Sequence, residues 1–186
     1  MRKLIVFNSV TLDGYFTGAD GDLIWAHKSD PEWNTFVSGN AQGDSEMVWG
    51  RVTYEMMAGW WPSPQALKSM PEVAARMNSA SKVVFSRTLR EAAWNNTTLV
   101  KSDPAATIRT MKRAPGPDLI IFGSGTIVSQ LAQAGLIDEF QIVLNPLALG
   151  RGRTMFEGVQ TPLNLKLTKT RAFKNGNVLL WYNPAA

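Results

Sequence analysis

Apolar residues fall along this chain in short continuous runs, separated by segments with helical spacing. Runs rich in β-branched and aromatic residues predict buried strands over residues 2–12, 45–49, 82–85, 118–122 and 139–147. Between the first two runs, Trp33, Phe36 and Val37 stand at i, i+3 and i+4, the spacing of one buried helix face. Because helices separate these strands, we predict an α/β fold in three layers, αβα, around a mostly parallel central sheet.

Capping residues mark where several helices begin. Asp30-Pro31-Glu32 predicts a helix capped by Asp30, with proline at its first position and an acid in its first turn. Ser69-Met70-Pro71-Glu72 matches a capping box ahead of a helix that runs through about Ser79. The segment 60–64, rich in tryptophan and proline, predicts an irregular packed loop. Three further helices are predicted over residues 51–57, 103–113 and 126–134.

The end of the chain predicts an antiparallel hairpin. Strand-like segments 163–170 and 177–183 are joined through Asn175-Gly176, a pair typical of a type I′ turn. The outer strand would leave an edge that could pair with a second copy in a homodimer. Since residues 1–186 contain no linker-like or repeated segment, we expect one domain.

Composition excludes several kinds of chemistry. The 186 residues include no Cys and one His, which excludes disulfides, cysteine nucleophiles and Cys or His metal clusters, so no metal is expected. A Ser-His-Asp site would depend on His27, near which no nucleophile motif stands. No apolar run approaches the length of a membrane span or a signal segment, so we expect a soluble cytoplasmic protein that binds no membrane.

The net charge is +4, and the charged residues are unevenly distributed: the N-terminal third is acidic and the remainder is basic. The basic residues are scattered singly, without a Lys/Arg tract or interleaved aromatic residues, so the pattern favours a small anionic ligand over nucleic acid.

Three predicted strand ends carry groups suited to phosphate. They are Gly123-Ser124-Gly125, Gly50-Arg51 with Thr53, and Ser86-Arg87-Thr88. Ligands of open α/β sheets lie beyond the carboxyl ends of the strands, where glycine admits a pyrophosphate and helix N–H groups point at it. Each turn alone is also explained by helix capping and solvated charge. Together they predict a phosphorylated nucleotide as ligand.

These motifs resemble the dihydrofolate-reductase-like family. Within it, the chain looks most like the C-terminal reductase domain of the bifunctional riboflavin-biosynthesis deaminase/reductase and its stand-alone relatives. The resemblance covers the chain in the family's order and also rests on Thr11-Leu12-Asp13-Gly14, Gly21-Asp22 with Trp25, Tyr54-Glu55 and Leu136-Ile137-Asp138-Glu139. It implies a mostly parallel dihydrofolate-reductase-like sheet and an NADPH-dependent oxidoreductase.

The resemblance also implies roles for individual residues toward NADPH. Ser9 and Phe16 would lie near the nicotinamide, under a mobile loop over residues 11–22. The cofactor phosphates would contact Arg51 and Thr53, the adenosine end with its 2′-phosphate Ser86, Arg87 and Thr88, and the pyrophosphate Gly123, Ser124, Gly125, Thr126 and Ile127.

The substrate side is less defined. Asp30 is the first candidate for a catalytic acid and Asp13 the second, although helix capping and a tight turn also explain them. Trp25 would stack on a planar ring. Gly150 and Arg151, followed by Arg153, would either grip a substrate phosphate or form an exposed loop.

The predicted function is hydride transfer from NADPH to a small pterin- or pyrimidine-like heterocycle. The alternative is a catalytically silent nucleotide-binding module of the same fold.

Overall fold

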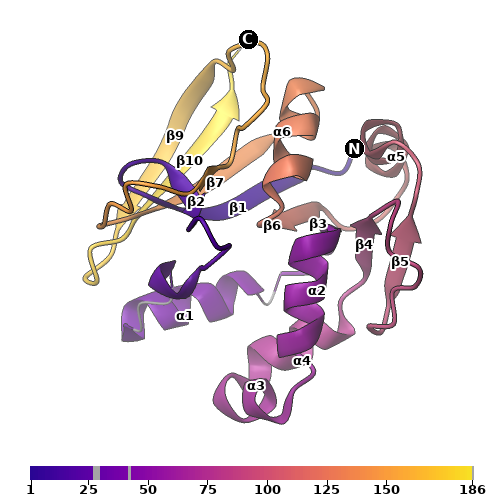
Figure 1. Cartoon of the computed structure of the whole chain (residues 1–186), viewed down its shortest axis with the longest axis horizontal. Coiled ribbons are helices and arrows are strands. Elements are labelled where there is room, and N and C mark those ends of the chain that lie inside the picture. Colours follow the sequence, from indigo (N-terminus) through magenta and orange to yellow (C-terminus); the bar gives the residue numbers. More distant parts are fainter. Residues whose placement is uncertain (27–29, 42, 186) are drawn as a thin grey trace.

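The computed structural model describes residues 1–26, 30–41 and 43–185. Within them, eight strands form one sheet in the order β5-β4-β3-β6-β1-β7-β10-β9. These strands are β1 Leu4–Thr11, β3 Glu46–Gly50, β4 Lys82–Phe85, β5 Thr97–Val100, β6 Leu119–Phe122, β7 Glu139–Asn145, β9 Leu165–Ala172 and β10 Val178–Pro184. The N-terminal strand therefore lies inside the sheet, and the C-terminal hairpin extends one end of it (Figure 1). His27 lies outside the described residues.

The sheet is parallel from β5 to β7 and antiparallel beyond. Neighbouring strands from β5 through β7 all pair in parallel. Strand β10 then runs antiparallel to both β7 and β9. This arrangement confirms the predicted α/β fold with a C-terminal hairpin, and it places β9 at the sheet edge.

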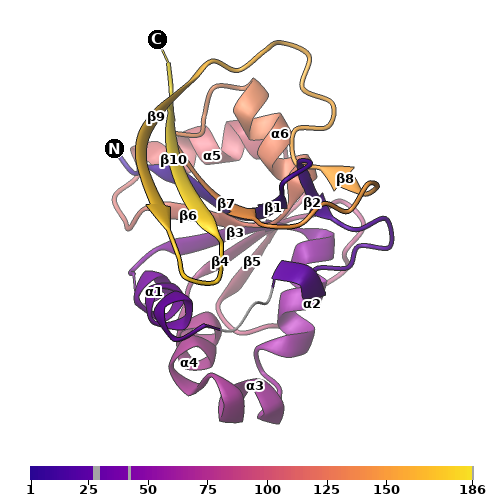
Figure 2. The ribbon, with the colours of Figure 1, turned by 90° about the vertical axis from the view of Figure 1, so that its left-hand side faces the viewer.

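Helices cover both faces of the sheet, as Figure 2 shows with α5 and α6 above it and the earlier helices below. Residues Ile108 and Leu131, from α5 and α6, belong to the buried cluster on one face. Tyr54 and Met77, from α2 and α4, belong to the cluster on the other face, beside which Trp33 of α1 packs. The helices are α1 Pro31–Ala41, α2 Arg51–Trp60, α3 Pro64–Ser69, α4 Pro71–Ser79, α5 Pro104–Arg113 and α6 Gly125–Gln133.

Burial on both faces explains the continuous apolar runs of the parallel strands. In β6, Leu119 and Ile121 join the α6-side cluster, whereas Ile120 joins the α2-side cluster. Because neighbouring side chains point to opposite faces and both faces are covered, every position of such a strand favours an apolar residue.

The prediction for residues 60–70 was partly wrong. Trp60 ends α2, and after a two-residue turn Ser63 accepts a hydrogen bond from the Ala66 N–H and caps the short helix α3. The predicted capping box does not form, because Ser69 belongs to α3 and Met70 is the N-cap of α4. The proline at 64 starts a helix, where its missing N–H costs nothing.

Two predictions about strands and turns also need correction. The sequence pattern missed β5, whose Thr97 and Thr98 interrupt any apolar run. The hairpin turn is not type I′, because φ is positive at Gly176 (86°) but not at Asn175. The Gly176 N–H instead donates to Phe173 O and the Phe173 N–H to Asn177 O, which makes a longer loop closed by glycine.

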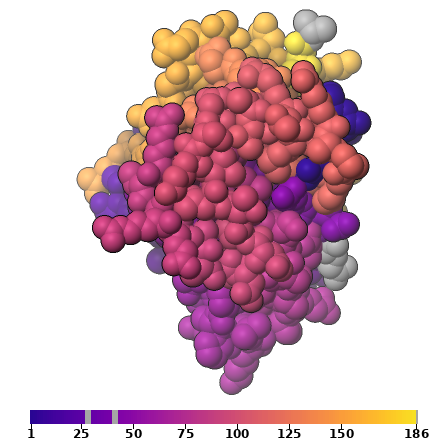
Figure 3. Space-filling model, turned by 90° about the vertical axis from the view of Figure 1, so that its right-hand side faces the viewer, coloured from indigo at the N-terminus to yellow at the C-terminus, as the bar shows by residue number. Residues whose placement is uncertain are grey.

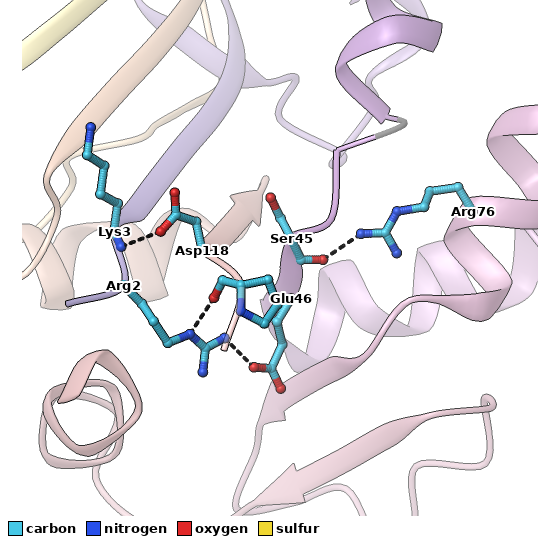
Figure 4. Close-up of polar contacts among 7 residues, drawn as sticks. Arg2, Lys3, Ser45, Glu46, Arg76 and Asp118 are labelled. Carbon is cyan, nitrogen blue, oxygen red and sulfur yellow. Dashed lines mark hydrogen bonds and ion pairs between the residues drawn. The ribbon is translucent and has the colours of Figure 1, made fainter. Parts of the chain in front are cut away.

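Polar contacts pin the start of β1 to its neighbours (Figure 4). The guanidinium of Arg2 lies 2.5 Å from Oε2 of Glu46 at the start of β3, and its Nε donates to Pro117 O. The Lys3 N–H donates to Oδ1 of Asp118 at 2.7 Å. Arg76 of α4 donates a hydrogen bond to the carbonyl oxygen of Ser45, the residue before Glu46.

Figure 3 shows the molecule from the β5 side, where the pink and coral segments from β4 to α5 form much of the surface.

Candidate functional site

Two of the three predicted phosphate-binding turns meet in the structure. The Gly50 N–H, between β3 and α2, donates to Oγ of Ser124 at 2.9 Å. A Cβ on Gly50 would lie 3.1 Å from Ile127, and one on Gly123 would lie 3.2 Å from the methyl group of Thr53. The backbones approach so closely because both turns use glycine. The carboxyl ends of β3 and β6 therefore present one continuous surface.

The helices that leave these two turns have no side-chain cap. Ser124, the N-cap of α6, has left-handed backbone angles (φ 65°) and directs its hydroxyl to the Gly50 N–H instead of its own helix. Gly50, the N-cap of α2, has no side chain to use. By contrast, Asp30 and Asp103 cap α1 and α5 with their carboxylates. The first-turn N–H groups of α2 and α6 thus keep the donors and positive dipole end that attract anions.

The third predicted turn faces the N-terminus of α2. Oγ of Ser86 accepts the N–H groups of Thr88 (3.2 Å) and Leu89 (2.9 Å) and so shapes the turn after β4. A pocket of about 740 Å³ lies between this turn and α2, and it is lined by Arg51, Glu55, Thr88, Leu89, Arg90, Glu91 and Ala93. The structure therefore places Arg51 and Thr88 in the lining of one pocket, and their roles toward a nucleotide stay a prediction.

The pocket also contains an arginine that the sequence did not single out. Arg87 is exposed and does not line the pocket, whereas Arg90 does. The bonds of Ser86 to the next backbone N–H groups fold the chain back, so the cation after the turn faces α2. Ser86 is the residue in the sequence that could have indicated this turn, because a serine hydroxyl often accepts hydrogen bonds from the backbone N–H groups that follow it.

Phe16 packs against the start of α6. A Cβ on Gly125 would lie 2.6 Å from the tip of the Phe16 ring, and the ring is 8% exposed within the α6-side cluster. Ser9 lies half-buried on β1 with the parity of Phe7, which packs on the opposite face of the sheet. Phe16 therefore fills the space that Gly125 leaves. Thr126 is exposed at the helix start and Ile127 is buried.

The predicted mobile loop over residues 11–22 is anchored. Strand β2 (Tyr15–Thr17) pairs with β8 (Arg153–Thr154) in a second, two-stranded sheet. The Gly21 N–H donates to Gly18 O in a turn at the Asp20-Gly21 pair. The pairing partner comes from a distant segment, which the local pattern did not reveal.

Asp13 clamps this loop to the loop after β7. Its carboxylate accepts the Thr11 hydroxyl (2.5 Å) and the N–H groups of Leu149 (3.0 Å) and Gly150 (2.7 Å). The Thr11 hydroxyl and then the Gly150 N–H lower the pKa of Asp13 below its usual value of 3.8. Hydrogen bonds to the charged form have this effect, so Asp13 is ionised at neutral pH.

Asp13→Asn is expected to release this clamp, because an amide has one acceptor oxygen and its NH₂ group would face N–H donors. We expect amide hydrogen exchange at Leu149 and Gly150 to become about fivefold faster, since a charge-assisted hydrogen bond is stronger than a neutral one. Hydrogen exchange followed by NMR measures this. Asp20→Asn changes the same charge in the same loop and serves as control. Equal exchange in the two variants would refute the clamp.

The other predicted substrate-side residues lie in separate segments. Oδ1 of Asp30 accepts the Trp33 N–H at 3.0 Å, which confirms the predicted cap. Trp25 lies half-buried in the short 3₁₀ helix η1 (Ile24–Ala26), and its Nε1 donates to Asp22 O at 3.2 Å. Gly150 has positive φ (72°), and Arg151 after it is exposed. Of these residues, Gly150 lies beside Asp13, because its N–H donates to the Asp13 carboxylate.

In the described residues no group of three or more His, Cys, Asp or Glu side chains is placed to hold a metal ion. Nor is any helix of the described segments long and apolar enough to cross a membrane.

A family model described as the RibD C-terminal domain matches residues 2–179. The chain belongs to the RibD C-terminal domain family. This confirms the resemblance that the turn motifs indicated. The uncharacterized protein YyaP of Bacillus subtilis is 29% identical over 182 residues, which are 98% of this chain and 95% of that protein.

Three solved structures share the fold of this RibD C-terminal domain chain. One is a putative riboflavin biosynthesis protein from Shewanella sp. PV-4, with TM-score 0.74, 23% identity and 99% of each chain covered. The second is a diaminohydroxyphosphoribosylaminopyrimidine deaminase/5-amino-6-(5-phosphoribosylamino)uracil reductase from Thermotoga maritima, with TM-score 0.70 and 15% identity over 99% of this chain and 57% of that one. The third is dihydrofolate reductase from Enterococcus faecalis in complex with NADP(H), with TM-score 0.65 and 15% identity over 99% and 97% of the two chains.

Proposed function

We propose that this protein is an NADPH-dependent reductase that transfers a hydride to a small pterin- or pyrimidine-like heterocycle. The observation that carries the proposal is the meeting of the Gly50 and Gly123–Gly125 turns, whose two helices present uncapped N-termini next to Arg51. Membership of the RibD C-terminal domain family supports it, as do the names of two structural neighbours, a uracil reductase and a dihydrofolate reductase with NADP(H).

The residues present suit a dinucleotide with several phosphates. The N–H groups from Gly125 to Ile127 would hold the pyrophosphate, because they lie at an uncapped helix start. Arg51 and Thr53 would hold phosphate oxygens from α2, and Ser86, Thr88 and the nearby Arg87 the adenosine end. NADPH supplies the hydride, and the protein supplies binding and orientation.

Phe16 and Ser9 would line the nicotinamide end from two sides. Phe16 packs against Gly125 and would shield the nicotinamide end from water. The β2–β8 pairing and the Asp13 clamp hold Phe16 in this position.

For the substrate, Trp25 would stack on the heterocycle, and Gly150 and Arg151 would bind a polar or phosphate substituent. Asp30 is our choice for the acid that delivers a proton, because Asp13 uses both carboxylate oxygens to hold the loop and has a lowered pKa.

The alternative is a nucleotide-binding module without catalysis. The contacts of both candidate acids favour it, since Asp30 caps α1 and Asp13 clamps two loops. Steady-state assays with NADPH and a panel of folates, pyrimidine ribosylamines and quinones separate the two. Turnover with any member of the panel excludes the silent module, whereas tight NADPH binding without turnover favours it.

Arg51→Ala is expected to weaken NADPH binding about tenfold, since it removes a charge-assisted hydrogen bond to phosphate. Quenching of tryptophan fluorescence on titration with NADPH measures the affinity. Arg109→Ala removes the same charge from an exposed position on α5 and should bind like the parent. The proposal fails if the parent does not bind NADPH at millimolar concentration, and the role of Arg51 fails if both variants bind alike.

A further inference from the structure

The pocket beside α2 balances its cations with carboxylates. Arg51 and Arg90 line it, but so do Glu55 and Glu91. Nη1 of Arg51 lies 2.8 Å from Oε2 of Glu55, one helical turn further along α2. The cation that the proposed function assigns to nucleotide phosphates is therefore already paired with an acid inside the pocket.

A phosphate group would compete with Glu55 for this cation. A guanidinium binds phosphate best through two parallel N–H bonds, and one of these donors is held by the carboxylate. A phosphate that shares Arg51 with Glu55 also brings two anions to within a few ångströms of each other, and they repel.

A ribose hydroxyl meets neither difficulty. It is uncharged, and it can donate a hydrogen bond to a carboxylate, which is how many dinucleotide-binding proteins recognise an unphosphorylated ribose. The Arg51–Glu55 ion pair therefore weakens the binding of a 2′-phosphate, whereas a 2′-hydroxyl can bind beside it.

Because Arg51 lines the same pocket as Thr88, a residue assigned above to the adenosine end, its guanidinium lies within the site of the 2′-phosphate. We propose that Glu55 sets the choice between NADPH and NADH in this protein by competing with that 2′-phosphate for Arg51. The proposal rests on the nucleotide-binding function proposed above. Both side chains are about half exposed (44% for Arg51 and 46% for Glu55), so the pair opens at little cost. Glu55 thus lowers the affinity for NADPH relative to that for NADH, so NADH can still be used.

The test compares two fragments that differ at the 2′ position, adenosine 2′,5′-bisphosphate and AMP, by isothermal titration calorimetry on the full chain. Glu55→Gln is expected to bind the bisphosphate about fivefold more tightly than the parent at low salt, the effect of one charge at contact distance in a solvated site. AMP affinity should change less than twofold. The gain should shrink in high salt, because exposed charges are screened.

Two further variants show whether the gain comes from freeing Arg51. Glu91→Gln removes the same charge from the same pocket, and no ion pair to Glu91 is found in the described part of the chain. Its gain should be smaller than that of Glu55→Gln. In an Arg51→Ala background, Glu55→Gln should no longer improve bisphosphate binding.

The outcomes separate the two proposals. If the parent binds both fragments and Glu55→Gln leaves the bisphosphate affinity unchanged, or improves it no more than Glu91→Gln does, the role of Glu55 is overturned and nucleotide binding stands. If the parent binds neither fragment, both proposals fall.

Discussion

Glu46→Ala is expected to lower the free energy of unfolding by about 3–5 kcal/mol, the usual result of leaving a buried charge without its partner. The side chain of Arg2 is 7% exposed, and its guanidinium lies 2.5 Å from Glu46. Its Nε donates to Pro117 O, and the guanidinium lies 3.2 Å from where a Cβ on Gly116 would stand. Arg2 therefore has little room to turn toward solvent once Glu46 is removed.

The loss should be large because this pair joins segments far apart in sequence. Arg2 precedes β1, Glu46 begins β3, and Pro117 precedes β6, the strand between them (Figure 4). Urea denaturation followed by tryptophan fluorescence measures the change. Glu157→Ala is the control, because its partner Arg153 lies 3.9 Å away and both side chains are more than half exposed. Such surface pairs contribute about 0–1 kcal/mol. Equal losses in the two variants would contradict the prediction.

The sequence predicted the interior strands and most helices well for physical reasons. Strands buried on both faces favour apolar residues at every position, so β6 and, after Lys82, β4 stand out as continuous runs. Asp103 followed by proline marks the start of α5, because each residue satisfies or removes an N–H that a helix start leaves free. These signals are local and can be recognised without knowing the fold.

Elements that depend on distant partners were missed. Strand β5 lies at the sheet edge, where its threonines are tolerated because only one neighbour, β4, pairs with it. Strand β2 exists through its pairing with β8, which lies far along the chain. Neither segment carries a pattern that distinguishes it from a loop.

The candidate site also has some features that could be predicted from the sequence and others that depend on distant contacts. The carboxyl ends of parallel strands lie at one edge of a sheet, so the Gly50 and Gly123 turns could be expected at the same edge, but the pairing of β3 with β6 that makes them neighbours could not. The place of Arg90 in the pocket could not be predicted either, because it depends on the turn that Ser86 shapes. The clamp by Asp13 was also hidden, since its partners are backbone N–H groups of a distant loop.

Gly152→Ala is expected to lower the free energy of unfolding by about 3 kcal/mol, at the upper end of the usual cost of overpacking. A Cβ at this position would lie 2.2 Å from the carbonyl oxygen of Thr17 and 3.2 Å from the side chain of Tyr15. A backbone oxygen cannot rotate away as a flexible side chain can. The variant must therefore push β2 away from β8, whose pairing holds Phe16 against Gly125.

Two other glycines separate this collision from the general effect of adding a methyl group. Gly158 has positive φ (85°) and open space around its Cβ direction, so alanine there should cost only about 1 kcal/mol of backbone strain. Gly59 lies inside α2 with nothing near its Cβ direction, so alanine there should stabilise the protein by about 0.5–1 kcal/mol. Denaturant unfolding of the three variants should rank them in this order. A loss at Gly152 no greater than at Gly158 would show that β2 and β8 separate freely, and that Phe16 is not held over the start of α6 by this pairing.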